Sequence, residues 1–111
     1  MSIIPSQGST RVQATPAYEL LVVQDQGEQI HTELTHAGWT VVHHTNDPMP
    51  WLDDIENALR VNAIIVSVKM LGFATDEASD DVVKCINMLP TYLFMEDGIW
   101  LELTLEDEND E

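Results

Sequence analysis

The chain has few basic residues and a single cysteine. Its 111 residues include 4 Lys and Arg against 20 Asp and Glu, which gives a formal net charge of -16. Nucleic-acid phosphates and anionic lipid headgroups repel such a chain, so direct binding to DNA, RNA or an anionic membrane surface is excluded. One Cys cannot build an intramolecular disulfide framework.

The chain also lacks a long apolar run. No stretch of about 18 apolar residues is present, and no basic segment precedes a shorter apolar one. The sequence therefore predicts neither a membrane span nor a secretory signal, and we expect a cytoplasmic protein. What it does contain is 44% hydrophobic residues, an ordinary share for a globular protein, in a chain with the length of one small domain.

Both ends of the chain differ in composition from its middle. Ser, Thr, Gln, Gly and Pro dominate residues 6–16 and no apolar period runs through them, so we expect a flexible N-terminal tail over residues 1–16. Within it, the opening Met1–Ile4 is apolar enough to dock on the domain. Residues 107–111 are predicted to be a mobile acidic tail, which leaves an α/β domain over residues 17–106.

Five short segments have the composition of β-strands, with apolar and β-branched residues between turn-forming ones. They are Tyr18–Val23, Thr40–Thr45, Ala63–Val68, Thr91–Met95 and Ile99–Leu105. The third is apolar almost throughout, which is typical of a strand buried on both faces of a parallel sheet. The last two flank the three-residue turn Glu96-Asp97-Gly98 and are predicted to form an antiparallel hairpin.

Three segments between these strands have apolar residues at helical spacing. Gly27–Ala37 is followed by Gly38, the expected C-cap. The second helix is expected to start at Pro48 or Pro50, and the third to span Thr75–Pro90. The apolar residues expected to face the core are Ile30, Leu34 and Ala37 in the first helix, Leu52, Ile55, Ala58 and Leu59 in the second, and Ala78, Val82, Cys85, Ile86 and Leu89 in the third.

The predicted order of elements is therefore β-α-β-α-β-α-β-β. Strands that are joined through helices are able to lie parallel, whereas the hairpin is antiparallel. We expect a single α/β domain with a small, mostly parallel sheet and a C-terminal antiparallel hairpin. A ferredoxin-like α+β arrangement is the alternative.

The first half of the chain resembles a response-regulator receiver domain. The resemblance lies in the strand Leu20–Val23, the helix end Ala37–Trp39 and the strand Val41–Val42. It implies a phosphoryl-accepting regulatory domain, but the residues that carry this chemistry do not match. A receiver has acids directly after its first strand, where this chain has Gln24-Asp25, and a phosphoacceptor Asp after its third, where this chain has Ser67–Lys69. We carry no receiver chemistry over and keep only a degenerate, receiver-like adaptor as an alternative.

No motif in the chain indicates catalysis, a metal or a cofactor. His31 and His36 are five residues apart, so they do not share a helix face, and His43 and His44 are neighbours that point to opposite faces of a strand. We expect the surrounding acids to raise the pKa of these histidines. Cys85 falls in a buried helical stripe without positive charge nearby, which favours a packing role over a nucleophile.

The acidic residues are concentrated in the second part of the chain. Residues 1–52 contain five acids and one basic residue, and residues 53–111 contain fifteen acids and three basic residues, so the formal charges are -4 and -12. The third predicted helix holds two pairs of acids at a spacing of four residues, where like charges destabilise a helix by roughly 0.2–0.5 kcal/mol per pair. Because these acids lower the stability of the helix, we expect that their charge serves another role, namely binding.

We therefore expect a non-enzymatic acidic protein that binds and inhibits a basic protein, one that handles nucleic acid. Such proteins include nucleic-acid mimics by which phages and mobile elements counter host defences, and immunity proteins that neutralise nucleases. The expected contact residues are the anchors Trp51 and Trp100 and the acids Asp53, Asp54, Glu56, Asp76, Glu77, Asp80, Asp81, Glu96, Asp97, Glu102 and Glu106. Trp39 is expected in the core. The alternative is a small acidic adaptor or regulatory domain, monomeric or homodimeric, whose charge serves solubility or salt adaptation.

Overall fold

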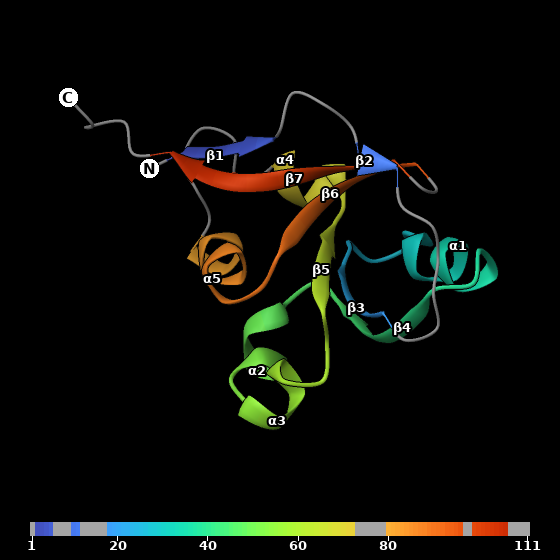
Figure 1. Cartoon of the computed structure of the whole chain (residues 1–111), viewed down its shortest axis with the longest axis horizontal. Coiled ribbons are helices and arrows are strands. Elements are labelled where there is room, and N and C mark those ends of the chain that lie inside the picture. Colours follow the sequence, from blue (N-terminus) through green and yellow to red (C-terminus); the bar gives the residue numbers. More distant parts are fainter. Residues whose placement is uncertain (1, 6–9, 12–17, 73–79, 97–98, 107–111) are drawn as a thin grey trace.

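A computed structural model describes residues 2–5, 10–11, 18–72, 80–96 and 99–106 of the chain (Figure 1). The strands are β1 (Ser2–Pro5), β2 (Thr10–Arg11), β3 (Glu19–Val23), β4 (Thr40–Thr45), β5 (Ala63–Val66), β6 (Thr91–Glu96) and β7 (Ile99–Glu106). The helices are α1 (Ile30–His36), α2 (Pro48–Leu52), α3 (Ile55–Ala58), α4 (Val68–Gly72) and α5 (Asp80–Met88).

The strands form one sheet in the order β1-β7-β6-β5-β3-β4, and β2 pairs with β7 beside this path. β4, β3, β5 and β6 follow one another in the sheet and are parallel to each other, whereas β7 is antiparallel to β6, β1 and β2. The predicted α/β domain with a parallel centre and a C-terminal hairpin is confirmed. The parallel centre excludes the ferredoxin-like alternative.

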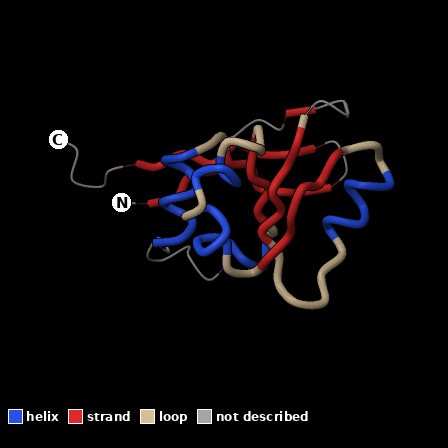
Figure 2. Tube along the Cα trace, turned by 90° about the horizontal axis from the view of Figure 1, so that it is seen from below, coloured by secondary structure: helices blue, strands red, loops and turns tan. Residues whose placement is uncertain are grey.

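Helices cover both faces of the sheet (Figures 1 and 2). Alternate residues of β3 belong to two cores: Leu20 and Val22 pack with α1, whereas Leu21 and Val23 pack with residues of α2, α4 and α5. The central strands are therefore apolar on both sides, as the sequence of β5 predicts. No helix among the described residues is both long and apolar enough to cross a membrane.

The N-terminal segment is partly structured. β1 pairs with β7 through Ile3 opposite Leu105, and β2 pairs with it through Thr10 opposite Trp100. The prediction of an unstructured tail over residues 1–16 is wrong for these two segments. The reason is tertiary: the edge of β7 that faces away from β6 offers backbone groups to pair with, which composition does not report. The rest of this tail, and residues 107–111, lie outside the described residues.

The second predicted helix is broken into α2 and α3. The carboxylate of Asp54 accepts a hydrogen bond from the backbone N–H of Glu56 at 3.0 Å, which caps a new helix after α2 ends. The break turns the following apolar side chains outward, so Ile55 is 69% and Leu59 80% exposed, whereas Leu52 is 2% exposed. The predicted stripe of Leu52, Ile55, Ala58 and Leu59 is therefore wrong for Ile55 and Leu59.

The segment after β5 also differs from the prediction, because α4 begins at Val68, which was expected to end the strand. The side-chain oxygen of buried Ser67 accepts a hydrogen bond from the backbone N–H of Met70 at 3.0 Å, so β5 ends and α4 follows directly. Residues 73–79, which include the predicted N-cap Thr75, lie outside the described part of the chain. In α5, Val82 and Cys85 are buried as predicted.

Trp100 is buried, with 1% of its surface exposed. Its ring lies 4.7 Å from that of Trp39 and 5.6 Å from that of Tyr92, in the core beneath α1. The prediction that Trp100 is an exposed anchor is wrong, because the second face of β7 is covered at this position. The prediction that Trp39 belongs to the core is confirmed.

The same substitution on the two sides of the α2–α3 break should have opposite consequences. Leu52→Ala removes a buried side chain and is expected to lower the free energy of unfolding by about 2–5 kcal/mol. Leu59→Ala truncates an exposed side chain and should change it by less than about 0.5 kcal/mol. Urea denaturation followed by tryptophan fluorescence measures both values, and equal losses would contradict the described break.

Candidate functional site

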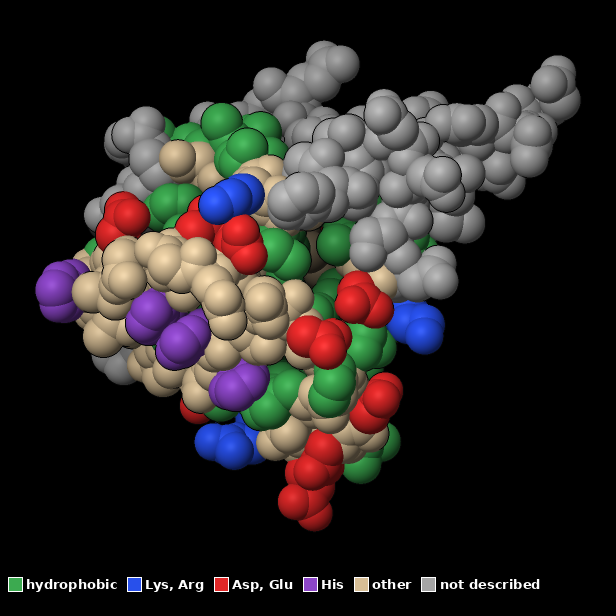
Figure 3. Space-filling view, turned by 180° about the vertical axis from the view of Figure 1, so that it is seen from behind, with side chains coloured by type: hydrophobic (Ala, Val, Ile, Leu, Met, Phe, Trp, Pro, Cys, Tyr) green, Lys and Arg blue, Asp and Glu red, His purple; other side chains and the backbone are tan. Residues whose placement is uncertain are grey.

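Three of the predicted contact acids meet at the corner between α2 and α3. Asp53, Asp54 and Glu56 are all exposed there, and the exposed apolar side chains Ile55 and Leu59 lie in the same short segment. Figure 3 shows acidic side chains gathered over α2 and α3 with apolar side chains between them. We call these five residues the acidic corner.

The structure describes the side chains of two further predicted contact acids, Asp81 and Glu102. Asp81 lies on α5, in the helix layer that also holds α2, whereas Glu102 is exposed on β7 and faces the side of α1, because it alternates with core residues of the other face. Asp80, Glu96 and Glu106 lie in described elements without described side chains, and Asp76, Glu77 and Asp97 lie outside the described residues. Glu102 therefore lies on the other side of the sheet from the acidic corner.

Trp51 is half-buried instead of projecting from the surface. Its ring is nearly parallel to that of His43, with an interplanar angle of 11° and 5.1 Å between ring centroids. Its backbone carbonyl accepts a hydrogen bond from the side chain of Asn57 at 3.0 Å, which joins α2 to α3. Trp51 thus packs beneath the acidic corner. The exposed apolar side chains of this corner are Ile55 and Leu59, whereas the sequence predicted that an exposed tryptophan would fill this role.

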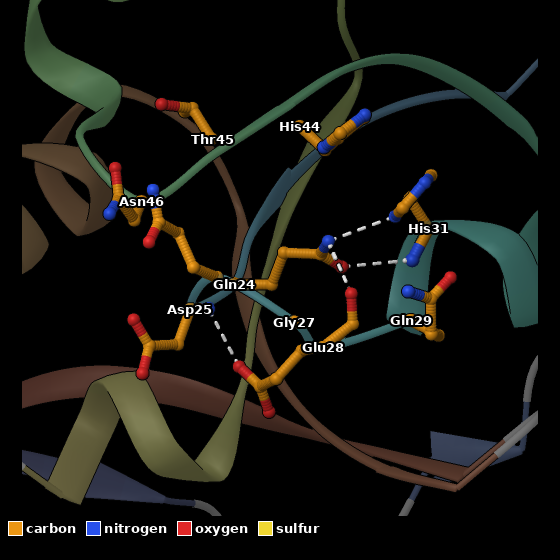
Figure 4. A pocket seen from close by; sticks show the side chains of 10 residues that line it. Gln24, Asp25, Gly27, Glu28, Gln29, His31, His44, Thr45 and Asn46 are labelled. Atoms are coloured by element: carbon orange, nitrogen blue, oxygen red, sulfur yellow. Dashed lines mark hydrogen bonds between the residues drawn. The ribbon is translucent and has the colours of Figure 1, made fainter.

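A polar pocket lies at the carboxyl ends of β3 and β4 (Figure 4). Its volume is about 390 Å³, and it is the place where open α/β sheets bind ligands. The residues that line it are Gln24, Asp25, Gln26, Gly27, Glu28, Gln29, His31, His44, Thr45 and Asn46. The side chains of the loop between β3 and α1 form most of its wall.

Gln24 fixes the form of this loop. Its side chain is 5% exposed, its carbonyl oxygen accepts a hydrogen bond from the backbone N–H of His31 at 3.0 Å, and its amide nitrogen donates to the carbonyl of Glu28 at 2.9 Å. The same amide nitrogen lies 2.9 Å from Nδ1 of His31. Because an amide nitrogen only donates, Nδ1 is the acceptor and its proton sits on Nε2.

Two histidines, His31 and His43, differ from the expected direction of their pKa. His31 stacks on His44, with ring centroids 3.8 Å apart and an angle of 11°. Burial, and then the neighbouring His44, lowers the pKa of both His31 and His43 below the ordinary 6.5. The prediction that surrounding acids raise the pKa is therefore wrong for these two, because local desolvation outweighs the more distant, solvent-screened carboxylates.

An ion pair joins the carboxyl ends of β3 and β5. Lys69 Nζ lies 3.2 Å from Asp25 Oδ2, and this contact, together with the backbone N–H of Gln26, lowers the pKa of Asp25. Asp25 is the acid that follows the first strand in the receiver resemblance. The position of the receiver phosphoacceptor, after β5, holds buried Ser67 instead of Asp. The chain therefore has no aspartate to accept a phosphoryl group at the end of β5.

Metal and thiol chemistry find no support in the site. Across the described ranges, no group of three or more His, Cys, Asp and Glu side chains could hold a metal ion. Cys85 is buried among core side chains, and burial, with Asp81 nearby, raises its pKa to about 12. A thiol of this kind packs as predicted and has almost no thiolate at neutral pH.

The chain was compared with family models, curated proteins and solved structures, and none of them matches it. The candidate site therefore rests on geometry. The sequence did not predict Ile55 and Leu59 as site residues. The signal for them was the acid pair before Ile55, because an acid at this position can cap a new helix. The sequence did not predict Gln24 either, whose only signal was a polar residue directly after a buried strand.

The burial of Cys85 predicts its reactivity. At pH 8 a thiol of pKa about 12 has a thiolate fraction about a thousandfold lower than one at 9.0, so the folded protein should resist 5,5′-dithiobis(2-nitrobenzoic acid). In concentrated guanidinium chloride the same Cys should react within seconds to minutes. Absorbance at 412 nm follows the reaction, and rapid labelling of the folded chain would contradict the buried thiol.

Proposed function

We propose that the chain is a non-enzymatic protein-binding domain whose acidic corner occupies a basic surface on a protein that handles nucleic acid. The observation that supports this most directly is the exposure of Ile55 and Leu59 beside three exposed carboxylates. Binding there would compete with the nucleic acid and so inhibit the partner.

The apolar residues of the corner supply the first argument. Protein interfaces have an apolar centre, free of charge, within a polar rim. Two branched aliphatic side chains that are 69% and 80% exposed, framed by Asp53, Asp54 and Glu56, have this composition. Burying an exposed Ile or Leu against a partner contributes about 1.5–3 kcal/mol each, which is enough to matter for affinity.

The charge supplies the second argument, and it supports a basic partner. A net charge of -16 attracts basic surfaces from a distance and raises the rate of encounter at low salt. Surfaces basic enough to respond are those that bind the phosphate backbone of nucleic acids. The three exposed carboxylates of the corner would pair with the basic groups of such a surface in place of phosphates.

The solubility alternative explains the charge but not the apolar residues. A surface shaped for solubility keeps Ile and Leu away from water and has no need to expose two of them so close together in the chain. The structure of this corner thus favours binding over a purely solvating role for the acids nearby.

Two matched double variants test the proposal. Asp53→Asn with Glu56→Gln removes two exposed carboxylates from the corner and leaves the capping Asp54 intact. Glu33→Gln with Glu102→Gln removes two exposed carboxylates elsewhere, so the net charge is the same. A basic protein captured by the wild-type chain at low salt, once purified, should associate several-fold more slowly with the first variant than with the second, as measured by stopped-flow fluorescence.

A third variant tests the apolar centre. Ile55→Ser with Leu59→Ser should raise the dissociation rate tenfold or more while leaving the association rate and its salt dependence unchanged. Duplex DNA should compete with the chain for the partner. Equal effects of the two charge variants, or association that is insensitive to salt, would contradict the proposal.

A further inference from the structure

The hydrogen bonds of Gln24 leave its amide group only one orientation. Turning the amide over would place its nitrogen against the backbone N–H of His31 and its oxygen against the carbonyl of Glu28, so both of its firm hydrogen bonds would become repulsive. The amide nitrogen therefore faces His31 Nδ1 at 2.9 Å whatever the protonation state of the ring.

Protonation of His31 conflicts with this arrangement. A charged imidazole carries hydrogen on both ring nitrogens, so Nδ1–H would face the N–H groups of Gln24 and two donors would meet. The ring cannot relax towards β4, because it stacks there on His44 at 3.8 Å. Two charged imidazoles at this separation would repel each other as well.

The charged groups around His31 do not relieve the conflict. From β4, His44 acts on His31 and disfavours its protonation. In the β3–α1 loop, the Glu28 carboxylate accepts a hydrogen bond from the backbone N–H of Asp25 at 2.7 Å, pointing away from the ring in Figure 4, and Asp25 is paired with Lys69. On α1 itself, Glu33 is exposed.

We propose that Gln24 and His31 form a proton-operated latch on the β3–α1 loop, closed when His31 is neutral and opened when it is protonated. Opening frees the loop that forms most of the wall of the polar pocket, so access to the pocket depends on pH. The latch does not involve the acidic corner, and it stands or falls independently of the proposed function.

The sign of the effect follows from the direction of the pKa. The pKa of His31 in the folded chain lies below the 6.5 of the unfolded chain, so the unfolded or open form binds the proton more tightly. The latch therefore contributes its full stability above pH 6.5 and loses it as the pH falls through the lower value of the folded chain. Acid opens the latch and alkali closes it.

Nuclear magnetic resonance of the full chain between pH 8 and 5 tests the latch. At pH 8 His31 should carry its proton on Nε2, and its titration midpoint should lie below 6.5. The backbone amide of His31 and the side-chain amide of Gln24 should shift with the same midpoint. Between pH 6.5 and this midpoint, hydrogen exchange of the His31 amide, corrected for its intrinsic pH dependence, should rise about tenfold for each unit by which the pH falls.

His31→Asn supplies a matched change, because its amide oxygen takes the place of Nδ1 as an acceptor that does not titrate. It should abolish the pH dependence of the Gln24 resonances, whereas His36→Asn, the same substitution at an exposed position of the same helix, should preserve it. A proton on Nδ1 at pH 8, a midpoint at or above 6.5, or loop resonances that still titrate in His31→Asn would overturn the proposal.

A second variant keeps the test decisive if His31→Asn fails to fold. Gln24→Glu replaces the facing donor by an acceptor, which stabilises protonated His31. The midpoint of His31 should then rise above the wild-type value. An unchanged or lowered midpoint in Gln24→Glu would show that the two side chains do not interact as described.

Discussion

The burial of β3 on both faces and at both edges is the constraint on which the rest of the structure depends. Leu20–Val23 are at most 1% exposed, and the strand pairs in parallel with β4 on one side and β5 on the other. Parallel strands end at the same edge of a sheet, so each polar residue that follows a central strand arrives at one place. For this reason the loop that Gln24 holds lies at the same edge of the sheet as the ion pair between Lys69 and Asp25.

The sequence predicts those features that depend on local pattern. Continuous apolar runs indicate β3 and β5, and Gly38 ends α1 with a φ of 103°, a conformation that favours glycine. It does not predict features that depend on a third element. Trp100 alternates with leucines, a pattern that indicates a wet face, yet it is buried because the core beneath α1 reaches β7. Thr10 and Arg11 are polar, and they form the strand β2 because they pair with β7.

The acidic corner shows how a local capping choice decides what a surface displays. Had α2 continued, Ile55 and Leu59 would have followed Leu52 into the core at helical spacing. Asp54 instead begins a second helix and turns both residues outward. The repulsion among neighbouring acids is small in water, whereas exposed aliphatic area is removed from water only by a partner. The corner thus combines charge that acts at a distance with apolar surface that acts on contact.

A single extra residue in β4 places the histidines. Leu20 pairs with Val41 and Leu21 with His43, so Val42 is an additional residue between two pairs of the register. In a regular strand His44 would face α2 and His43 would face α1. The irregularity reverses this, so His44 stacks on His31 and His43 on Trp51. An edge strand therefore uses imidazoles to cover both of its faces. Because neutral imidazoles pack and charged ones demand water, the cohesion of this edge depends on pH in a way that the aliphatic centre of the sheet does not.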